Sequence, residues 1–319
     1  MKRKILVPVI ATLSAVLLLS GCGKKTKTEK QDKKEFTLTT QYIVDGEVSN
    51  TAPDGQFYDF VKIENDKNAT VEWNIKDWKP ETSELKEDTT CTVYFTKTTA
   101  VFKMNNTGYL TLQSAFNDVE PGIPAVVDCH SDFSGYAVSA AGTEITLNLN
   151  GHTIDGVGNN TISNQGLMYI FGEGTITNSL SSESSISIVN YGELTLTDVE
   201  LNNATSSITV WNSDNGISVM NLYNCDATHQ VTASNVINNS GVLNIYSGIY
   251  YATSDEGFCV IKINGPAAEL NYYDGTIDNN GEGFSIGLVD GSFHNLSAHD
   301  IEKGYNLGEE ATHTTPDAE

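Results

Sequence analysis

The feature that most constrains the fold of this chain is a repeat that begins near residue 143. Each copy carries an apolar-x-apolar segment, a few small polar residues and then one closing residue that is apolar or β-branched. The closing residues are separated by 22, 25, 26, 23 and 27 positions, and they are Ile154, Ile176, Leu201, Ala227, Tyr250 and Ile277. Such a period, with short strands and polar turns, is typical of one coil of a parallel β-helix. We therefore expect equivalent residues of neighbouring coils to lie about 4.8 Å apart.

A second strand in each copy leads into a turn that contains asparagine. We predict that these side chains stack in one column, because a carboxamide can bond both neighbours and also satisfy backbone groups of the turn. The predicted ladder consists of Asn164, Asn190, Asn212, Asn238 and Asn264. One residue conflicts with this ladder. The residue two positions before the asparagine is Ile or Val in the other copies, but before Asn264 it is Lys262. Either this coil contains a one-residue bulge or the proposed register slips there.

The run from Leu147 to Gly156, with the later Gly-x-Leu-x-Ile and Gly-Thr-Ile segments, resembles the right-handed parallel β-helix of the pectate-lyase-like superfamily. The resemblance covers about residues 105 to 300. It implies the fold but no single activity, since enzymes, tailspikes and adhesins share this scaffold. Relatives that cleave polysaccharides use an Arg or Lys base, or clustered Asp in Asn-Thr-Asp and Asp-Asp sequences. This chain has neither Asn-Thr-Asp nor Asp-Asp, and its only Arg is Arg3.

The N-terminus has the three parts of an export signal. Lys2, Arg3 and Lys4 precede an apolar stretch from residue 5 to 19 that is too short for a comfortable membrane span. The order Leu-Ser-Gly-Cys at residues 19–22 resembles the lipobox of bacterial lipoproteins, which implies that Cys22 is acylated. We thus predict a signal peptide at 1–21 and a lipidated Cys with a Lys-rich tether at 22–35. The mature protein would be anchored on the extracellular side of the cell membrane. An uncleaved anchor with an incidental Cys is the alternative.

Pattern and composition divide the rest of the chain. Short alternating strands predict a small all-β module at 36–99, followed by the parallel β-helix at 100–300 and a C-terminal tail at 301–319. Leu112, Ala115, Phe116 and Val119 have helical spacing and predict a helix that covers the open end of the stack. The expected fold class is all-β: a small N-terminal module, then a right-handed parallel β-helix with an N-terminal capping helix.

The charge of the chain excludes one class of partner. It contains 41 acidic and 18 basic residues, and no Lys or Arg occurs between Lys103 and Lys262. Cleavage before Cys22 would remove three basic residues, leaving 15 against 41, a formal charge of -26. Nucleic-acid binding needs a basic patch, so we predict no nucleic-acid partner. Anionic polymers are disfavoured for the same reason.

Carboxylates on neighbouring coils are the basis of an enzymatic alternative. Asp198 with Asp226, or Glu173 with Asp198, would lie near one face, and a glycosidase needs two carboxyls about 5 to 9.5 Å apart. An acid-rich solenoid produces such pairs without catalysis, so we assign no catalytic residue. Oxygen-rich turns at 213–216 and 278–282 suit calcium but are also ordinary turn sequences. We therefore predict no metal and no cofactor.

Four cysteines remain after Cys22 is assigned to lipid. Their even number permits disulfides in an exported protein, but they show no dense framework of close spacings. We interpret them as small buried apolar residues and leave their pairing open: Cys91, Cys129, Cys225 and Cys259.

The candidate binding residues are aromatic. Three consecutive coils place an apolar or aromatic residue and then a tyrosine in the same slot, so strand alternation points the first inward and the second outward. The outward residues are Tyr223, Tyr246 and Tyr273. Such a row can stack on sugar rings, or its rings can stack on each other. We predict a noncatalytic glycan-binding or adhesive surface lipoprotein whose ligand is a neutral glycan or a cell-surface group. The alternatives are a carbohydrate-active enzyme, hydrolase or lyase, on the same scaffold, and a structural spacer.

Overall fold

A computed structural model describes residues 36–55, 57–82, 85–181, 184–213, 218–297, 301 and 305–314. The predicted signal peptide, Cys22 and the tether lie outside the described residues. The chain divides into two compact units after Thr99, and each is described by itself. Within the described residues, no helix has the length and apolar character needed to cross a membrane.

The first unit is a small β module around an aromatic core. Its four-stranded sheet has the order β2-β1-β6-β3, in which β1 and β6 are parallel, and a separate hairpin joins β4 and β5. The Trp73 ring packs at 5.2 to 5.8 Å from the rings of Phe60, Trp78 and Phe95. The strands are β1 (Leu38–Val44), β2 (Glu47–Ser49), β3 (Tyr58–Asn65), β4 (Val71–Asn74), β5 (Lys79–Thr82) and β6 (Thr89–Lys97).

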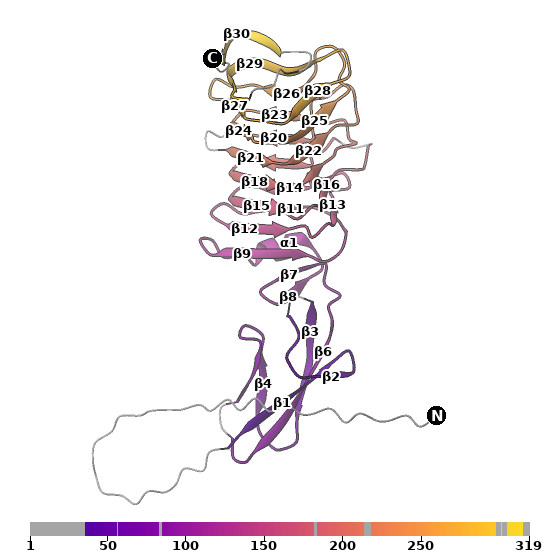
Figure 1. The fold of residues 1–319 in the computed structure, drawn as a ribbon, viewed down its shortest axis with the longest axis vertical. Helices are drawn as coiled ribbons and strands as arrows, with labels where there is room; N and C mark the ends of the chain where they lie inside the picture. The colour runs from indigo at the N-terminus through magenta and orange to yellow at the C-terminus, as the bar shows by residue number, and fades with distance from the viewer. Residues whose placement is uncertain are drawn as a thin grey trace, which may run out of the picture. The chain divides into compact units, whose positions relative to one another are not determined.

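The second unit is a right-handed parallel β-solenoid of about six turns over residues 133–295. Each turn contributes one strand to each of three series of parallel strands, which we call sheets 1, 2 and 3 (Figure 1). Sheet 1 contains β10 (Phe133–Ser134), β13 (Thr153–Asp155), β16 (Thr175–Thr177), β19 (Glu200–Leu201), β22 (Cys225–Thr228), β25 (Gly248–Ala252) and β28 (Thr276–Asn279). The fold class expected from the repeat is confirmed.

Sheets 2 and 3 follow in each turn and are joined through the long strand β29 (Phe284–Asn295). Sheet 2 contains β11 (Ala137–Val138), β14 (Ile162–Asn164), β17 (Ile188–Asn190), β20 (Val210–Asn212), β23 (Ile237–Asn239) and β26 (Cys259–Ile263). Sheet 3 contains β9 (Pro124–Cys129), β12 (Glu144–Asn148), β15 (Leu167–Phe171), β18 (Glu193–Thr197), β21 (Val219–Tyr223), β24 (Val242–Ile245) and β27 (Glu269–Tyr272).

The core of the solenoid consists of inward columns with one residue per turn. In sheet 1 the register aligns the closing residues of the sequence repeat, so that Ile154, Ile176, Leu201, Ala227 and Tyr250 are consecutive partners and all are buried. Outward positions alternate with them because strand residues point to opposite faces. The solenoid thus has a continuous apolar interior and three outward faces.

The first coil is closed by helix α1 (Leu112–Asn117), whose Leu112, Ala115 and Phe116 are buried in the core. Gln113 on this helix bonds the free edge of β11. Its Oε1 accepts from the Val138 N–H at 2.8 Å, and its Nε2 donates to the Val138 carbonyl at 3.2 Å. The side-chain amide thereby occupies the place of a preceding strand. Two short strands, β7 (Phe102–Met104) and β8 (Thr107–Tyr109), precede the helix.

At the other end, parallel pairing continues beyond residue 300, where the sequence predicts the tail to begin. Strand β30 (Tyr305–Thr314) pairs with β29 in parallel, with a register shift between Leu288 and Asp290. The repeat in this segment is not visible in the sequence, because its spacing and polarity differ from those of the preceding coils.

Candidate functional site

The three predicted tyrosines form a stacked row on the outward face of sheet 3. Tyr223 ends β21, while Tyr246 and Tyr273 directly follow β24 and β27, which lie one above another in Figure 1. The rings of Tyr223 and Tyr246 are parallel within 2° and 4.2 Å apart, and those of Tyr246 and Tyr273 are parallel within 1° and 4.8 Å apart. Tyr223 and Tyr273 remain 38% and 40% exposed.

This geometry decides which part of each tyrosine can meet a ligand. Both faces of the Tyr246 ring are covered by its neighbours, so a sugar ring cannot stack on the middle of the row. The ring edges and the hydroxyls are what the row presents. Hydrogen bonding with the Tyr223 hydroxyl raises the pKa of Tyr246, and burial raises it further. The ring faces therefore stack on each other, as the second alternative predicts, and a ligand could contact only the ring edges and the hydroxyls.

Beside the tyrosine row runs a column of amides that the sequence analysis missed. Asn221 Nδ2 donates to Thr195 Oγ1 at 3.2 Å, Asn244 Nδ2 donates to Asn221 Oδ1 at 2.8 Å, and Asn271 Nδ2 donates to Asn244 Oδ1 at 3.0 Å. These side chains are half-buried and lie two residues before the tyrosine slot of each strand. The signal was present in the sequence, as a polar residue between two inward residues in Leu-Thr-Leu, Met-Asn-Leu, Leu-Asn-Ile and Leu-Asn-Tyr.

The two columns define one surface, which we call the Tyr-Asn face. On its other side the register places Glu193, Val219, Val242 and Glu269 in a third column. No Lys or Arg occurs in strands β15, β18, β21, β24 or β27. The surface therefore combines hydroxyls and amides, two carboxylates flank it, and its strands carry no Lys or Arg. The Tyr-Asn face consists of Thr195, Asn221, Asn244, Asn271, Tyr223, Tyr246 and Tyr273.

A second, buried asparagine ladder stabilises the turns between sheets 2 and 3. Asn164 Nδ2 donates to Asn190 Oδ1 at 2.9 Å, Asn190 to Asn212 at 2.9 Å, and Asn212 to Asn239 at 2.8 Å. Ser139 Oγ donates to Asn164 Oδ1 and begins the column. Each amide also bonds turn carbonyls, as Asn190 does with Gly192 at 3.0 Å. The structure thus places three predicted members, and adds Asn239.

Two predicted members of the ladder are corrected. Asn212 pairs with Asn239, so Asn238 pairs instead with Trp211 and Lys262 on the outward side. Asn264 is exposed, and the column continues with the buried Ile263. The conflict at Lys262 has a simple cause. The next ladder residue lies 27 positions after Asn212, whereas the predicted spacing of 26 selects Asn238, the neighbour of the correct Asn239. The same shift of one residue places Lys262 where the structure has Ile261.

The carboxylates considered for catalysis gather at an open hollow of about 280 Å³ where sheet 3 turns into sheet 1. Asp198 accepts from Asn224 Nδ2 at 2.6 Å, and Asp226 accepts from the Ile249 N–H at 3.0 Å. The positive φ values of Glu173, Asp198 and Asn224, 50° to 56°, explain polar residues at these turns. The hollow is lined by Glu173, Gly174, Asp198, Val199, Glu200, Asn224 and Asp226.

These carboxylates lie exposed at the surface of the solenoid. A glycosidase keeps one carboxyl protonated, and burial in an apolar site is the usual means of raising its pKa. Here Glu173, Asp198, Glu200 and Asp226 are all exposed, and three of them accept hydrogen bonds from neighbouring groups of the solenoid. The hollow therefore brings exposed carboxylates together without enclosing any of them in an apolar site.

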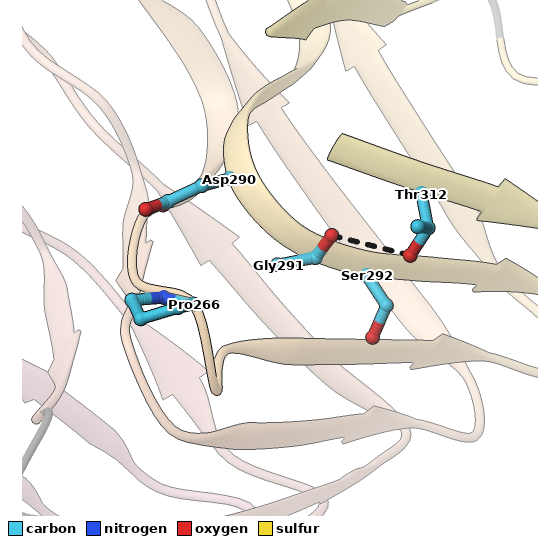
Figure 2. Close-up of a pocket in the computed structure, with 5 residues that line it drawn as sticks. All are labelled: Pro266, Asp290, Gly291, Ser292 and Thr312. Atoms are coloured by element: carbon cyan, nitrogen blue, oxygen red, sulfur yellow. Dashed lines mark hydrogen bonds between the residues drawn. The ribbon is translucent and has the colours of Figure 1, made fainter. Parts of the chain in front are cut away.

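A second open hollow, of about 270 Å³, lies near the last coil (Figure 2). Its Asp290 carboxylate points to the turn that carries Pro266 and accepts from the Gly265 N–H, while Thr312 Oγ1 donates to the Gly291 carbonyl at 3.3 Å. Both hollows are smaller than most pockets that enclose a small molecule. The polar groups named here serve turns of the solenoid itself.

Two other groups of residues have structural roles in the described part of the chain: the turn at 278–282 that was considered for calcium, and the four cysteines. Asn279 Oδ1 accepts from the N–H groups of Ser254 and Gly281, and residues 214–217 of the other turn lie outside the described part of the chain. The described residues contain no group of three or more His, Cys, Asp or Glu side chains arranged to hold a metal. All four cysteines there are free and buried, and burial raises the pKa of Cys225 to about 12.

Comparison of the chain with known protein families, with curated proteins and with solved structures finds no match. The class of the protein therefore follows from its own fold. It is a right-handed parallel β-solenoid, capped by a helix, whose most distinctive outward surface is the Tyr-Asn face.

Proposed function

We propose that the protein is a noncatalytic, membrane-anchored surface lipoprotein that binds a neutral glycan through the Tyr-Asn face. The observation that carries the proposal is the repetition of one phenol and one amide per coil, side by side, on three consecutive strands. Glycan hydroxyls both donate and accept, as phenol and amide groups do. The resemblance to the pectate-lyase-like superfamily supports the same ligand class, since polysaccharides are bound on that scaffold.

The charge of the surface supports a neutral ligand. Glu193 and Glu269 flank the face, and the whole chain has a formal charge of -23. An anionic polymer would approach against this field without a cation to receive it. Neutral sugars meet no such barrier.

Conservative variants test the glycan proposal. Replacing Tyr223, Tyr246 and Tyr273 together by Phe keeps the stack but removes the hydroxyls. On glycan arrays we expect the full-length protein to bind neutral glycans and the triple Tyr→Phe variant to lose at least tenfold in affinity, because two or three hydrogen bonds of about 1 kcal/mol each are removed. The matched control is Tyr251→Phe, a half-buried tyrosine on the outward side of sheet 1, which should leave binding unchanged.

Three outcomes on the same arrays count against the proposal. Undiminished binding by the triple variant would move the site away from this face. Preference for anionic glycans would contradict the argument from charge. New reducing ends released from a bound polysaccharide would favour the hydrolase alternative at Asp198 and Asp226, or a lyase if the new ends are unsaturated, over binding alone.

The anchor is the second part of the proposal. The basic residues, the short apolar stretch and the Leu-Ser-Gly-Cys order support acylation of Cys22. One acyl chain holds a protein weakly, so we expect more than one on the mature N-terminus. Cys22→Ala should leave the precursor uncleaved and without acyl groups, as read by mass spectrometry of the N-terminal peptide after cell fractionation. Unchanged processing at the same residue in this variant would contradict the lipoprotein assignment.

A further inference from the structure

We propose that the ligand is a linear polysaccharide that lies along the solenoid axis with one sugar opposite each coil. This inference rests on the proposed function and adds the class of glycan and its orientation. Its basis is the direction in which equivalent groups repeat. Tyr223, Tyr246 and Tyr273 follow one another along the axis, 4.2 and 4.8 Å apart.

The ring planes give the direction. Because the three rings are parallel within 1° to 2° and stack from coil to coil, their edges line up along the axis. A glycan chain that runs across the solenoid axis would contact the tyrosine and the asparagine of a single coil. A chain that follows the axis meets the same pair of groups at each coil, at the strand spacing of about 4.8 Å.

The column bonds leave hydrogen-bonding capacity on two of its three amides, Asn221 and Asn244. A carboxamide has two N–H groups and two acceptor sites. The column takes one N–H of Asn244 for Asn221 and one acceptor site of Asn244 for Asn271. One N–H and one acceptor site of Asn244 are not used by these column bonds, and the same holds for Asn221, which donates to Thr195 and accepts from Asn244.

The column also has defined ends. Asn271 uses both of its N–H groups, on Asn244 and on Glu269 Oε1 at 2.7 Å. At the other end the column passes from Asn221 to the hydroxyl of Thr195. In the tyrosine row the equivalent positions beyond Tyr223 and Tyr273 are Thr197 and Leu296. The repeating pair of one phenol and one amide thus spans three coils, which sets the length of glycan that the face can engage.

A length series tests the inference. The probes are β-1,4-linked oligomers of glucose, mannose and N-acetylglucosamine with two to six sugars, titrated calorimetrically into the full-length protein. We expect affinity to rise about fivefold for each added sugar up to roughly three, because each coil adds about one hydrogen bond, and then to level off. Asn221→Ala should make the plateau begin one sugar earlier. Asn202→Ala is the matched control and should leave the series unchanged, because Asn202 is a half-buried asparagine that directly follows β19 of sheet 1.

The outcomes separate this inference from the proposed function. Equal affinity for disaccharides and hexasaccharides, reduced at least tenfold in both cases by the triple Tyr→Phe variant, would leave the glycan-binding face in place and overturn the axial linear ligand. Absence of binding by every oligomer and every neutral glycan on the array would overturn both. A plateau that Asn221→Ala does not shift would also overturn the axial arrangement.

Discussion

Replacing Asn190 by Ala is expected to destabilise the solenoid by about 3 kcal/mol. The side chain is fully buried and donates to Asn212 Oδ1 and to the carbonyls of Gly192 and Val219 at 2.9 to 3.0 Å. It also accepts from Asn164 Nδ2 at 2.9 Å and from the Gly192 N–H at 3.2 Å. Alanine replaces none of these bonds, so buried polar groups of two neighbouring coils lose their partner at once. The measurement is urea unfolding followed by circular dichroism.

The matched control for this variant is Asn264→Ala. Asn264 lies in the equivalent turn of a later coil, but its side chain is exposed and outside the column. We expect a change within about 0.5 kcal/mol for this exposed site. Equal destabilisation by both variants would mean that the turns depend on asparagine for their backbone conformation rather than for the ladder.

Gly192→Ala should destabilise the protein by a similar amount through a different cause. A Cβ at Gly192 would lie 2.1 Å from the carbonyl oxygen of Gly166 in the preceding coil, closer than real Cβ atoms come to backbone atoms. Neither group is the end of a flexible side chain, so the two coils would have to separate. Overpacking of this kind costs about 3 kcal/mol, and the midpoint of urea unfolding should fall accordingly.

Gly122→Ala distinguishes coil contact from backbone strain. Gly122 has a φ of +76° and no atom within 4 Å of the added Cβ, so only its left-handed conformation is penalised, by about 1 kcal/mol. If Gly192→Ala proves no more destabilising than Gly122→Ala, the coils are less tightly stacked at this turn than the Gly166 carbonyl distance indicates.

The fold was predictable because the repeat encodes it directly. An inward column needs one apolar residue per coil, so the regular spacing of the closing residues from Ile154 to Tyr250 is enough to predict that they stack. The helix was predictable from Leu112, Ala115 and Phe116. The Asn239 register was not, because Asn238 and Asn239 are adjacent and only the pairing of whole strands decides which one points inward.

The candidate site was predictable only in part. Strand alternation predicts that Tyr223, Tyr246 and Tyr273 share a row, but whether the rings offer their faces depends on side-chain torsions that no spacing specifies. In the structure the three rings stack face to face, with centroids 4.2 and 4.8 Å apart, so their faces are covered by each other. The amide column beside it depends on the strand register that brings carboxamides of different coils together, and the sequence does not specify that register.

The contact of Gln113 with Val138 gives the solenoid a fixed origin. The Gln113 amide ends sheet 2 at β11, and strand β7 ends sheet 3 by pairing with β9, so neither end depends on how many coils follow. Insertion or loss of one whole repeat, 22 to 27 residues, would change the length of sheet 3 by about 4.8 Å and leave this end intact. Duplication or deletion of single repeats in the gene would therefore change the length of the outward face by one coil at a time.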